Sequence, residues 1–138
     1  MNCGKTILGG LLLLMLMGCG APSATQPALS LSIPQGFLSG EGTPINNVFG
    51  VQLAVLVQRN GEPVAGISVT FTAPTSGASA TFTSTGKNQE TDITNSNGVA
   101  FQSSFLMANS TVGSWQLVAS AQGASNTIAF QMTNMPTP

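Results

Sequence analysis

Apolar and polar residues alternate with a period of two in residues 51–74. Before Asn60-Gly61 the apolar positions are Val51, Leu53, Val55 and Val57, and after it they are Ile67, Val69 and Phe71. Successive side chains of a strand point to opposite faces, so each apolar set is expected to pack against a core. Asn and Gly readily adopt the positive φ of a tight turn. The pattern predicts two strands joined by a turn.

The same alternation recurs in shorter segments on both sides of this stretch. Residues 80–83 and 90–94 are short candidate strands, and the longer apolar sets are Leu29, Leu31, Ile33; Val99, Phe101, Ser103, Phe105; Trp115, Leu117, Ala119, Ala121; and Ile128, Phe130, Met132. Turn residues separate them at intervals of roughly 8–12 residues, which is typical of a sandwich or barrel. Residues 39–47 contain Gly40, Gly42 and Pro44 and are predicted to be a loop. The fold class predicted is all-β.

Composition removes several classes of function. Of the 138 residues, 42% are hydrophobic and only 5% are charged, with a net charge of −1 and no histidine. Nucleic-acid binding is not expected, because it requires basic side chains that contact phosphates. Without histidine the commonest general base and neutral metal ligand are absent. We therefore expect no enzyme activity, no metal and no cofactor.

The N-terminal residues resemble an export signal. Lys5 precedes an apolar segment at residues 7–17, which is shorter than the roughly 20 residues that a membrane-spanning helix needs. We predict a signal peptide over residues 1–18, and the alternative is an uncleaved anchor.

The next residues, Leu16-Met17-Gly18-Cys19, resemble the lipobox of bacterial lipoproteins. The resemblance implies cleavage between Gly18 and Cys19 and lipidation of Cys19, with several acyl chains giving a stable membrane anchor. A Cys3–Cys19 disulfide is the alternative use of the two cysteines. Gly20 stands where an Asp would favour the inner membrane, so the resemblance implies a cell-envelope location at the outer membrane. It leaves open which side the domain faces.

Four segments are predicted along the chain. Residues 1–18 form the signal peptide, 19–28 the lipidated cysteine and a flexible linker, 29–134 the β domain, and 135–138 a disordered tail. The linker is uncharged with prolines at 22 and 27, and it reaches about 30 Å when extended at ~3.3 Å per residue.

Four motifs resemble the bacterial immunoglobulin-like domains of the invasin and intimin type. They are GEPVAGISVTF at residues 61–71, SGASATF at 76–82, NGVA at 97–100, and the A-N-x-x-x-G-x-W-x-L-x-A pattern at 108–119. The resemblance implies an immunoglobulin-like β-sandwich of about seven to eight strands, carried as a single copy. Two aspartates usual in the family are replaced, by Gln58-Arg59 and by Asn95. In this family the module is often an adhesive or spacer unit of surface proteins.

Two constellations admit a chemical and a structural interpretation. Glu90 and Asp92 lie two apart on one predicted strand and share a face, as a pair of acid and base carboxylates would. The structural interpretation is a pair of solvated charges, because no neighbouring group is available to position a substrate. Trp115 could stack on a sugar, but its alternation with Leu117 predicts a core aromatic.

Apolar residues also occur where the strand pattern does not call for them. Phe37 and Leu38 lie in a loop, and Leu56 interrupts the polar face of its strand. Together with Phe49, these residues form either a surface patch that contacts a partner or a cover over the bottom of the sandwich.

The function expected is that of a non-catalytic, lipid-anchored envelope protein acting in adhesion or in docking to another envelope component. The alternatives are a carbohydrate-binding module and a purely structural accessory subunit. The expected partners are the membrane, through the anchor, and a protein or glycan that the sequence does not identify.

Overall fold

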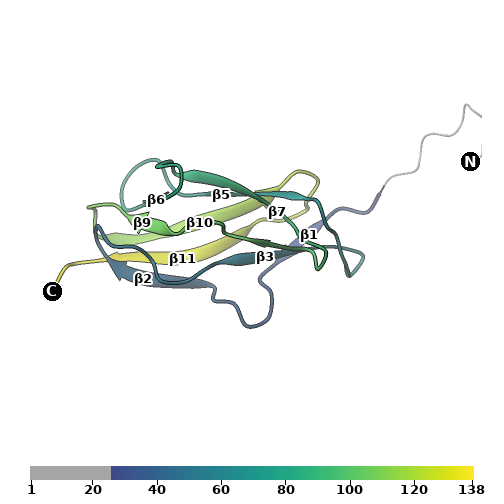
Figure 1. Cartoon of the computed structure of the whole chain (residues 1–138), viewed down its shortest axis with the longest axis horizontal. Coiled ribbons are helices and arrows are strands. Elements are labelled where there is room, and N and C mark those ends of the chain that lie inside the picture. The colour runs from purple at the N-terminus through teal and green to yellow at the C-terminus, as the bar shows by residue number, and fades with distance from the viewer. Residues whose placement is uncertain (1–25) are drawn as a thin grey trace, which may run out of the picture.

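The computed structural model describes residues 26–138, which form eleven strands and no helix (Figure 1). The strands are β1 (Ser30–Ser32), β2 (Gly40–Pro44), β3 (Ala54–Arg59), β4 (Glu62–Pro63), β5 (Ser68–Thr72), β6 (Ala80–Phe82), β7 (Gln89–Ile93), β8 (Val99–Phe101), β9 (Leu106–Ala108), β10 (Gly113–Ala121) and β11 (Ile128–Met135). The all-β prediction is confirmed. The predicted count of seven to eight strands is lower than the count found.

One layer is a five-stranded sheet in the order β2-β11-β10-β5-β7. Its strands are antiparallel except for β2, which runs parallel to β11. Residues directly opposite each other share a face, so the pairs Trp115↔Met132 and Leu117↔Phe130 point the same way, towards the core.

The second layer is built around β3. Strand β1 pairs with one edge of β3, whereas β4 and β8 pair with the other. Residues 47–49, which precede β3 in the chain, pair with β9: Phe49 N donates to Leu106 O at 2.8 Å, and Ala108 N donates to Asn47 O at 2.9 Å. Residues 47–49 therefore continue the layer alongside β9, and β6 pairs with the other edge of β9.

Gln102 holds the break between β8 and β9. Its side chain is 2% exposed, accepts a hydrogen bond from Leu53 N at 3.1 Å and donates one to Ser104 O at 2.7 Å. These side-chain bonds pair Leu53 N and Ser104 O where the layer curls and regular ladder bonds are interrupted. The break divides one predicted strand into two, which accounts for part of the higher count.

Both layers contribute to one core. Leu53, Val55 and Val57 of the β3 layer are fully buried, as their alternation predicts. Across the layers, the Phe49 and Trp115 rings meet edge to face with centroids 5.9 Å apart, a favourable geometry for aromatic pairs. The domain is therefore sandwich-like in its packing.

The predicted pairing of residues 51–57 with 67–72 is wrong. The turn is present, with positive φ at Asn60 and Gly61, but it leads into β4, and β5 lies in the other layer. Ile67 N donates to Thr94 Oγ1, and Thr94 N donates to Ile67 O, both at 2.9 Å. These bonds fix the start of β5 beside β7 and separate it from β3.

The loop predicted over residues 39–47 is also partly wrong, because it contains β2. A Cβ added at Gly40 would lie 1.9 Å from Gln131 O. Glycine is therefore what allows β2 to lie this close to β11. The glycine at position 40, which suggested a loop, is instead needed for the close contact between β2 and β11.

Candidate functional site

The outer face of β8 and β9 carries a row of apolar side chains. Phe101 is 37% exposed, Phe105 52% and Met107 42%. Val99 begins the row, and Val48 lies beside Met107 through an isolated bridge and is 40% exposed. We call these five residues, Val48, Val99, Phe101, Phe105 and Met107, the outer apolar row.

The sequence pattern predicts that Val99, Phe101 and Phe105 face the core, and this is wrong. The side chains that face inward are Ala100, Gln102, Leu106 and Ala108, all at most 2% exposed. The register explains the difference: Ala100 lies directly opposite Val55, and opposite residues share a face. Because Ala100 shares the inward face of Val55, its chain neighbours Val99 and Phe101 point outward.

Two residues of the predicted contact patch, Phe37 and Leu56, lie next to this row. The Phe37 ring is 5.6 Å from the Phe101 ring, and Leu56 lies opposite Val99 on the outer face and is partly buried. Leu38 follows Phe37 and is 51% exposed. Phe49 belongs to the core instead, since it is 1% exposed.

Sequence reasoning did not identify Val48 and Met107 as surface residues. The available signal was the apolar character of residues 99–108 at both odd and even positions. Apolar residues at both odd and even positions are typical of a strand that is covered on both faces.

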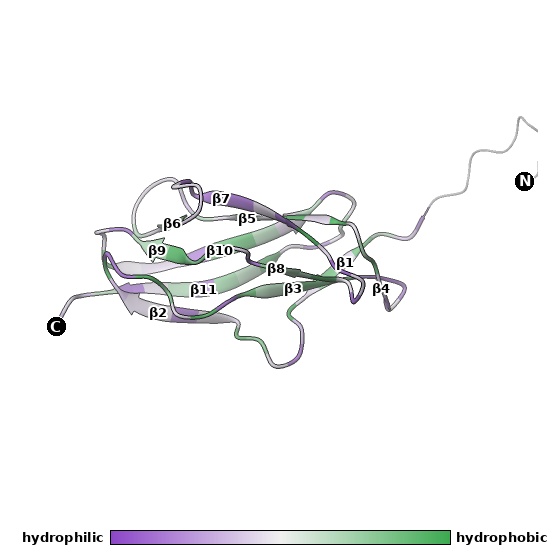
Figure 2. Cartoon of the chain, viewed as in Figure 1, coloured by the Kyte–Doolittle hydropathy of each residue, from purple (hydrophilic) through white to green (hydrophobic). Residues whose placement is uncertain are grey.

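The outer face of the five-stranded sheet has the opposite character. Hydroxyl pairs link neighbouring strands there, with Thr70 and Thr91 3.0 Å apart and Ser114 and Thr133 3.1 Å apart. Figure 2 shows β7 as hydrophilic and β9 as hydrophobic. The outer face of the five-stranded sheet is therefore more polar than the β8–β9 face, although Ile93 of β7 is 57% exposed.

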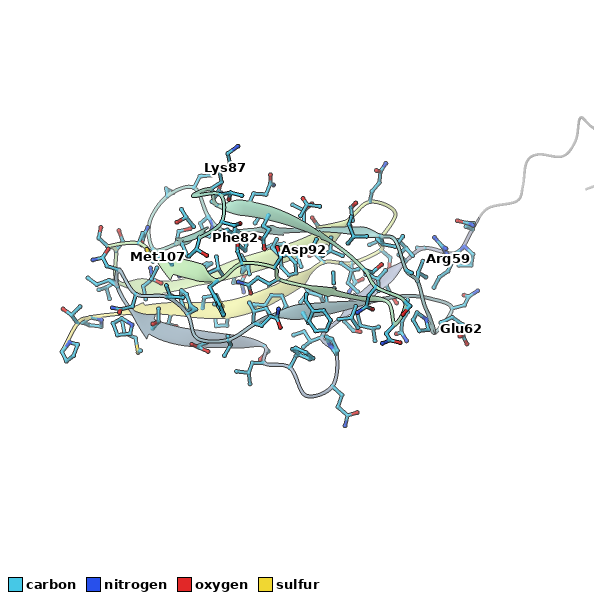
Figure 3. All side chains as sticks on the ribbon, in the orientation of Figure 1. Arg59, Glu62, Phe82, Lys87, Asp92 and Met107 are labelled. Atoms are coloured by element: carbon cyan, nitrogen blue, oxygen red, sulfur yellow. The ribbon has the colours of Figure 1, made fainter. Side chains whose placement is uncertain are left out.

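Most charged side chains lie away from the row, but the carboxylates of Glu90 and Asp92 lie beside its middle, where both accept hydrogen bonds from Ser103 N. Figure 3 shows Arg59 and Glu62 at the end where residues 26–28 lie, whereas Met107 lies towards the opposite end. The charged residues of the described part of the chain occur on sheet edges, turns and loops and are Glu41, Arg59, Glu62, Lys87, Glu90 and Asp92.

Trp115 is a core residue, as its alternation predicts. It is 6% exposed, and its Nε1 donates to Asn134 Oδ1 at 2.9 Å. The amide nitrogen of Asn134 lies 2.9 Å from both Ser79 O and Asn109 Oδ1. The indole is thus enclosed by a hydrogen-bond network and cannot stack on a sugar.

Glu90 and Asp92 share a face, but the expectation of two solvated charges is wrong for Glu90. Glu90 is 8% exposed and accepts hydrogen bonds from Ser103 N at 3.1 Å and Ser104 Oγ at 2.5 Å. Burial raises the pKa of the Asp92 carboxyl, hydrogen bonding from Ser103 opposes this, and the Glu90 charge raises the pKa further. The pair connects β7 to the segment between β8 and β9 through hydrogen bonds, so its role is structural.

A polar hollow of about 670 Å³ lies among the loops next to β6. Several polar groups that line the hollow already form hydrogen bonds within the protein. Ser79 Oγ donates to Pro74 O at 2.7 Å, and Asn109 Nδ2 donates to Gly77 O at 2.9 Å. No aromatic ring lines it. The hollow therefore offers few free groups that converge on a ligand.

Residues 26–138 contain no cluster of three or more acidic, cysteine or histidine side chains that could hold a metal ion. Within the same residues no helix has the length and apolarity to cross a membrane. The predicted cleavage site at Gly18 and lipidation site at Cys19 lie outside the described residues.

Comparison of the chain with models of known protein families, with curated proteins and with solved structures finds no match. The resemblance to bacterial immunoglobulin-like domains therefore rests on the sequence motifs alone.

Proposed function

We propose that this chain is a non-catalytic, lipid-anchored protein of the cell envelope that docks to another envelope component through its outer apolar row. The observation that carries the proposal is the exposure of Phe101, Phe105 and Met107 along one face of the β8–β9 segment. Exposed apolar patches of this kind mark interaction sites on soluble domains. A face that only had to meet water would carry polar residues, as the opposite sheet does.

The layer topology supports an immunoglobulin-like arrangement within this proposal. One layer contains β1, β3, β4 and β8 together with the β6–β9 pair, and the other joins β2, β11, β10, β5 and β7. Strand β2 leaves the first layer and runs parallel to the C-terminal strand of the second. Such sandwiches commonly serve as recognition units on cell surfaces.

Anchoring at Cys19 fits the position of the N-terminal end. Residues 26–28 and the C-terminus lie at opposite ends of the molecule (Figure 1). A linker attached to lipid at Cys19 would join the membrane to this end of the domain. The outer apolar row lies on a side of the domain and would remain accessible to neighbouring proteins.

Among the alternatives, a structural accessory subunit draws support from the same row, because it also requires a protein partner. Carbohydrate binding through Trp115 is not supported, because a buried indole ring cannot stack on a sugar. Adhesion through the row remains compatible with docking to an external protein.

Cell fractionation and protease shaving of intact cells test this proposal. We expect the wild-type chain in the membrane fraction with incorporated palmitate, and Cys19→Ala in the soluble fraction without it. Loss of the domain on shaving would place it outside the cell and favour adhesion, whereas protection until the outer membrane is opened would favour docking within the envelope. A Cys19→Ala chain that stays membrane-bound would contradict the anchor.

A further inference from the structure

We infer that a second copy of the chain covers the outer apolar row, in a parallel pair whose two-fold axis runs along β8 and β9. This inference rests on the proposed function, because it takes the docking partner to be another anchored copy. Three properties of the described residues support it: the area of the row, its lack of charge, and the position of the chain ends.

The area of the row suits the apolar centre of a protein interface. With about 200 Å² for a fully exposed large side chain, the exposed fractions of Val48, Phe101, Phe105 and Met107 amount to roughly 300–400 Å². One partner of a standard interface buries about 800 Å², of which roughly half or more is apolar. Two exposed residues next to the row, Thr81 on β6 and Thr83 just after it, would supply a polar rim.

The lack of charge favours a pair of identical surfaces over a charged partner. In a two-fold interface whose axis follows the row, each residue of the row faces its own copy. Any charged residue in the row would face a like charge, which is destabilising. The five residues of the row are all uncharged, whereas aromatic rings such as Phe101 and Phe105 pack favourably with one another.

The chain ends select the direction of the pair. The strands run along the long axis, and residues 26–28 lie at one end of it (Figure 1). A parallel pair brings both N-terminal ends to the same side, so both linkers can reach one membrane. An antiparallel pair would put them at opposite ends of the assembly, and one linker of about 30 Å would have to run back along the domain.

Cysteine cross-linking in membranes distinguishes the two directions. Val99 and Met107 mark the ends of the β8–β9 part of the row, at most about 26 Å apart at ~3.3 Å per residue. In the parallel pair, V99C and M107C each cross-link to their own copy under mild oxidation. In an antiparallel pair, neither variant cross-links with itself, and only V99C mixed with M107C does.

Two controls accompany this experiment. Gln116 lies on the outer face of the opposite sheet and is exposed, so Q116C should give only background cross-linking. Wild-type chain oxidised in parallel reports any contribution of Cys19. A monomeric M107C in the membrane fraction, or cross-linking of V99C only with M107C, would overturn the inference.

A charge introduced into the row gives a second, independent measurement. We expect F105E to shift the detergent-extracted chain from dimer to monomer by size, because the two carboxylates would face each other, and we expect Q116E to leave the dimer intact. An F105E chain that remains dimeric contradicts the inference. Palmitate labelling and the membrane fraction report on the anchor separately, so failure of the pair and failure of the proposed function give different results.

Discussion

At the scale of single residues, Asn134 is the most deeply buried polar side chain in residues 26–138. It is fully buried on β11 and is bonded to the Trp115 indole as well as to the Ser79 carbonyl. Removing its amide leaves these partners unpaired away from water, and unpaired buried groups are costly.

Asn134→Ala should therefore lower the free energy of unfolding by about 2–4 kcal/mol. The matched control is Gln131→Ala, an exposed position on the same strand, which should change it by less than about 0.5 kcal/mol. Urea denaturation of the purified variants measures both. Equal losses for the two substitutions would show that the network does not stabilise the core.

The carboxyl pair gives a prediction about pH. Because burial and the Glu90 charge raise the pKa of Asp92, its ionised form is disfavoured in the folded state relative to the unfolded state. The resulting loss of stability is fully present above the raised pKa, and it is relieved as the pH falls through that value towards the ordinary value of about 3.9.

Asp92→Asn should accordingly be more stable than the wild type at pH 7, and the difference should shrink as the pH is lowered through the raised pKa. Urea denaturation at a series of pH values tests this. A variant that is less stable at pH 7, with a difference that grows in acid, would mean that ionised Asp92 stabilises the fold.

At the scale of elements, the face that β8 and β9 present to the core is the main result that alternation does not reveal. Ala100→Leu should cost about 1–3 kcal/mol, because it overpacks a fully buried site. Phe105→Ser should change stability by less than about 0.5 kcal/mol at a concentration that keeps the chain monomeric. Denaturant titration compares them, and the reverse ranking would place the aromatic residues in the core.

The close parallel contact of β2 with β11 gives another element-scale prediction. Gly40→Ala would bring a Cβ within 1.9 Å of Gln131 O, whereas the nearest atoms to a Cβ at Gly42 are 3.5 Å away. We expect Gly40→Ala to lower the melting temperature by several degrees, a shift that corresponds to a loss of about 1 kcal/mol or more, and Gly42→Ala to leave it nearly unchanged. Similar shifts for both would argue that β2 is not held against β11.

These elements show what the sequence could and could not establish. Alternation placed Leu53, Val55, Trp115 and Leu117 correctly in the core, because larger apolar side chains recur there at every second position and most of the residues between them are polar or small. It was wrong for Phe101 and Phe105, because both faces of residues 99–108 are apolar and only the cross-strand register decides between them. Register is a long-range property, so no local pattern contains it.

The same limit applies to the candidate site. Phe37, Leu38 and Leu56 were identified because they depart from the expected pattern, and two of them lie next to the outer apolar row. Val48 and Met107 are separated by 59 positions in the sequence and become neighbours only through the bridge between them. A surface assembled from distant segments becomes visible only once the layers are in place.

At the scale of the whole molecule, the two methionines Met107 and Met135 allow a direct test of whether the outer apolar row is covered in the envelope. They are 42% and 39% exposed, and they lie on different layers. Methionine oxidises to its sulfoxide in proportion to its access to the reagent, so the two side chains serve as probe and internal control.

The measurement is the oxidation rate of each methionine in isolated envelopes, compared with the same chain extracted and diluted to a monomer. We predict that Met107 is protected in the envelope and becomes reactive on dilution, while Met135 reacts at a similar rate in both states. If Met107 oxidises as fast as Met135 in the envelope, the row is open to solvent there and the docking function is wrong.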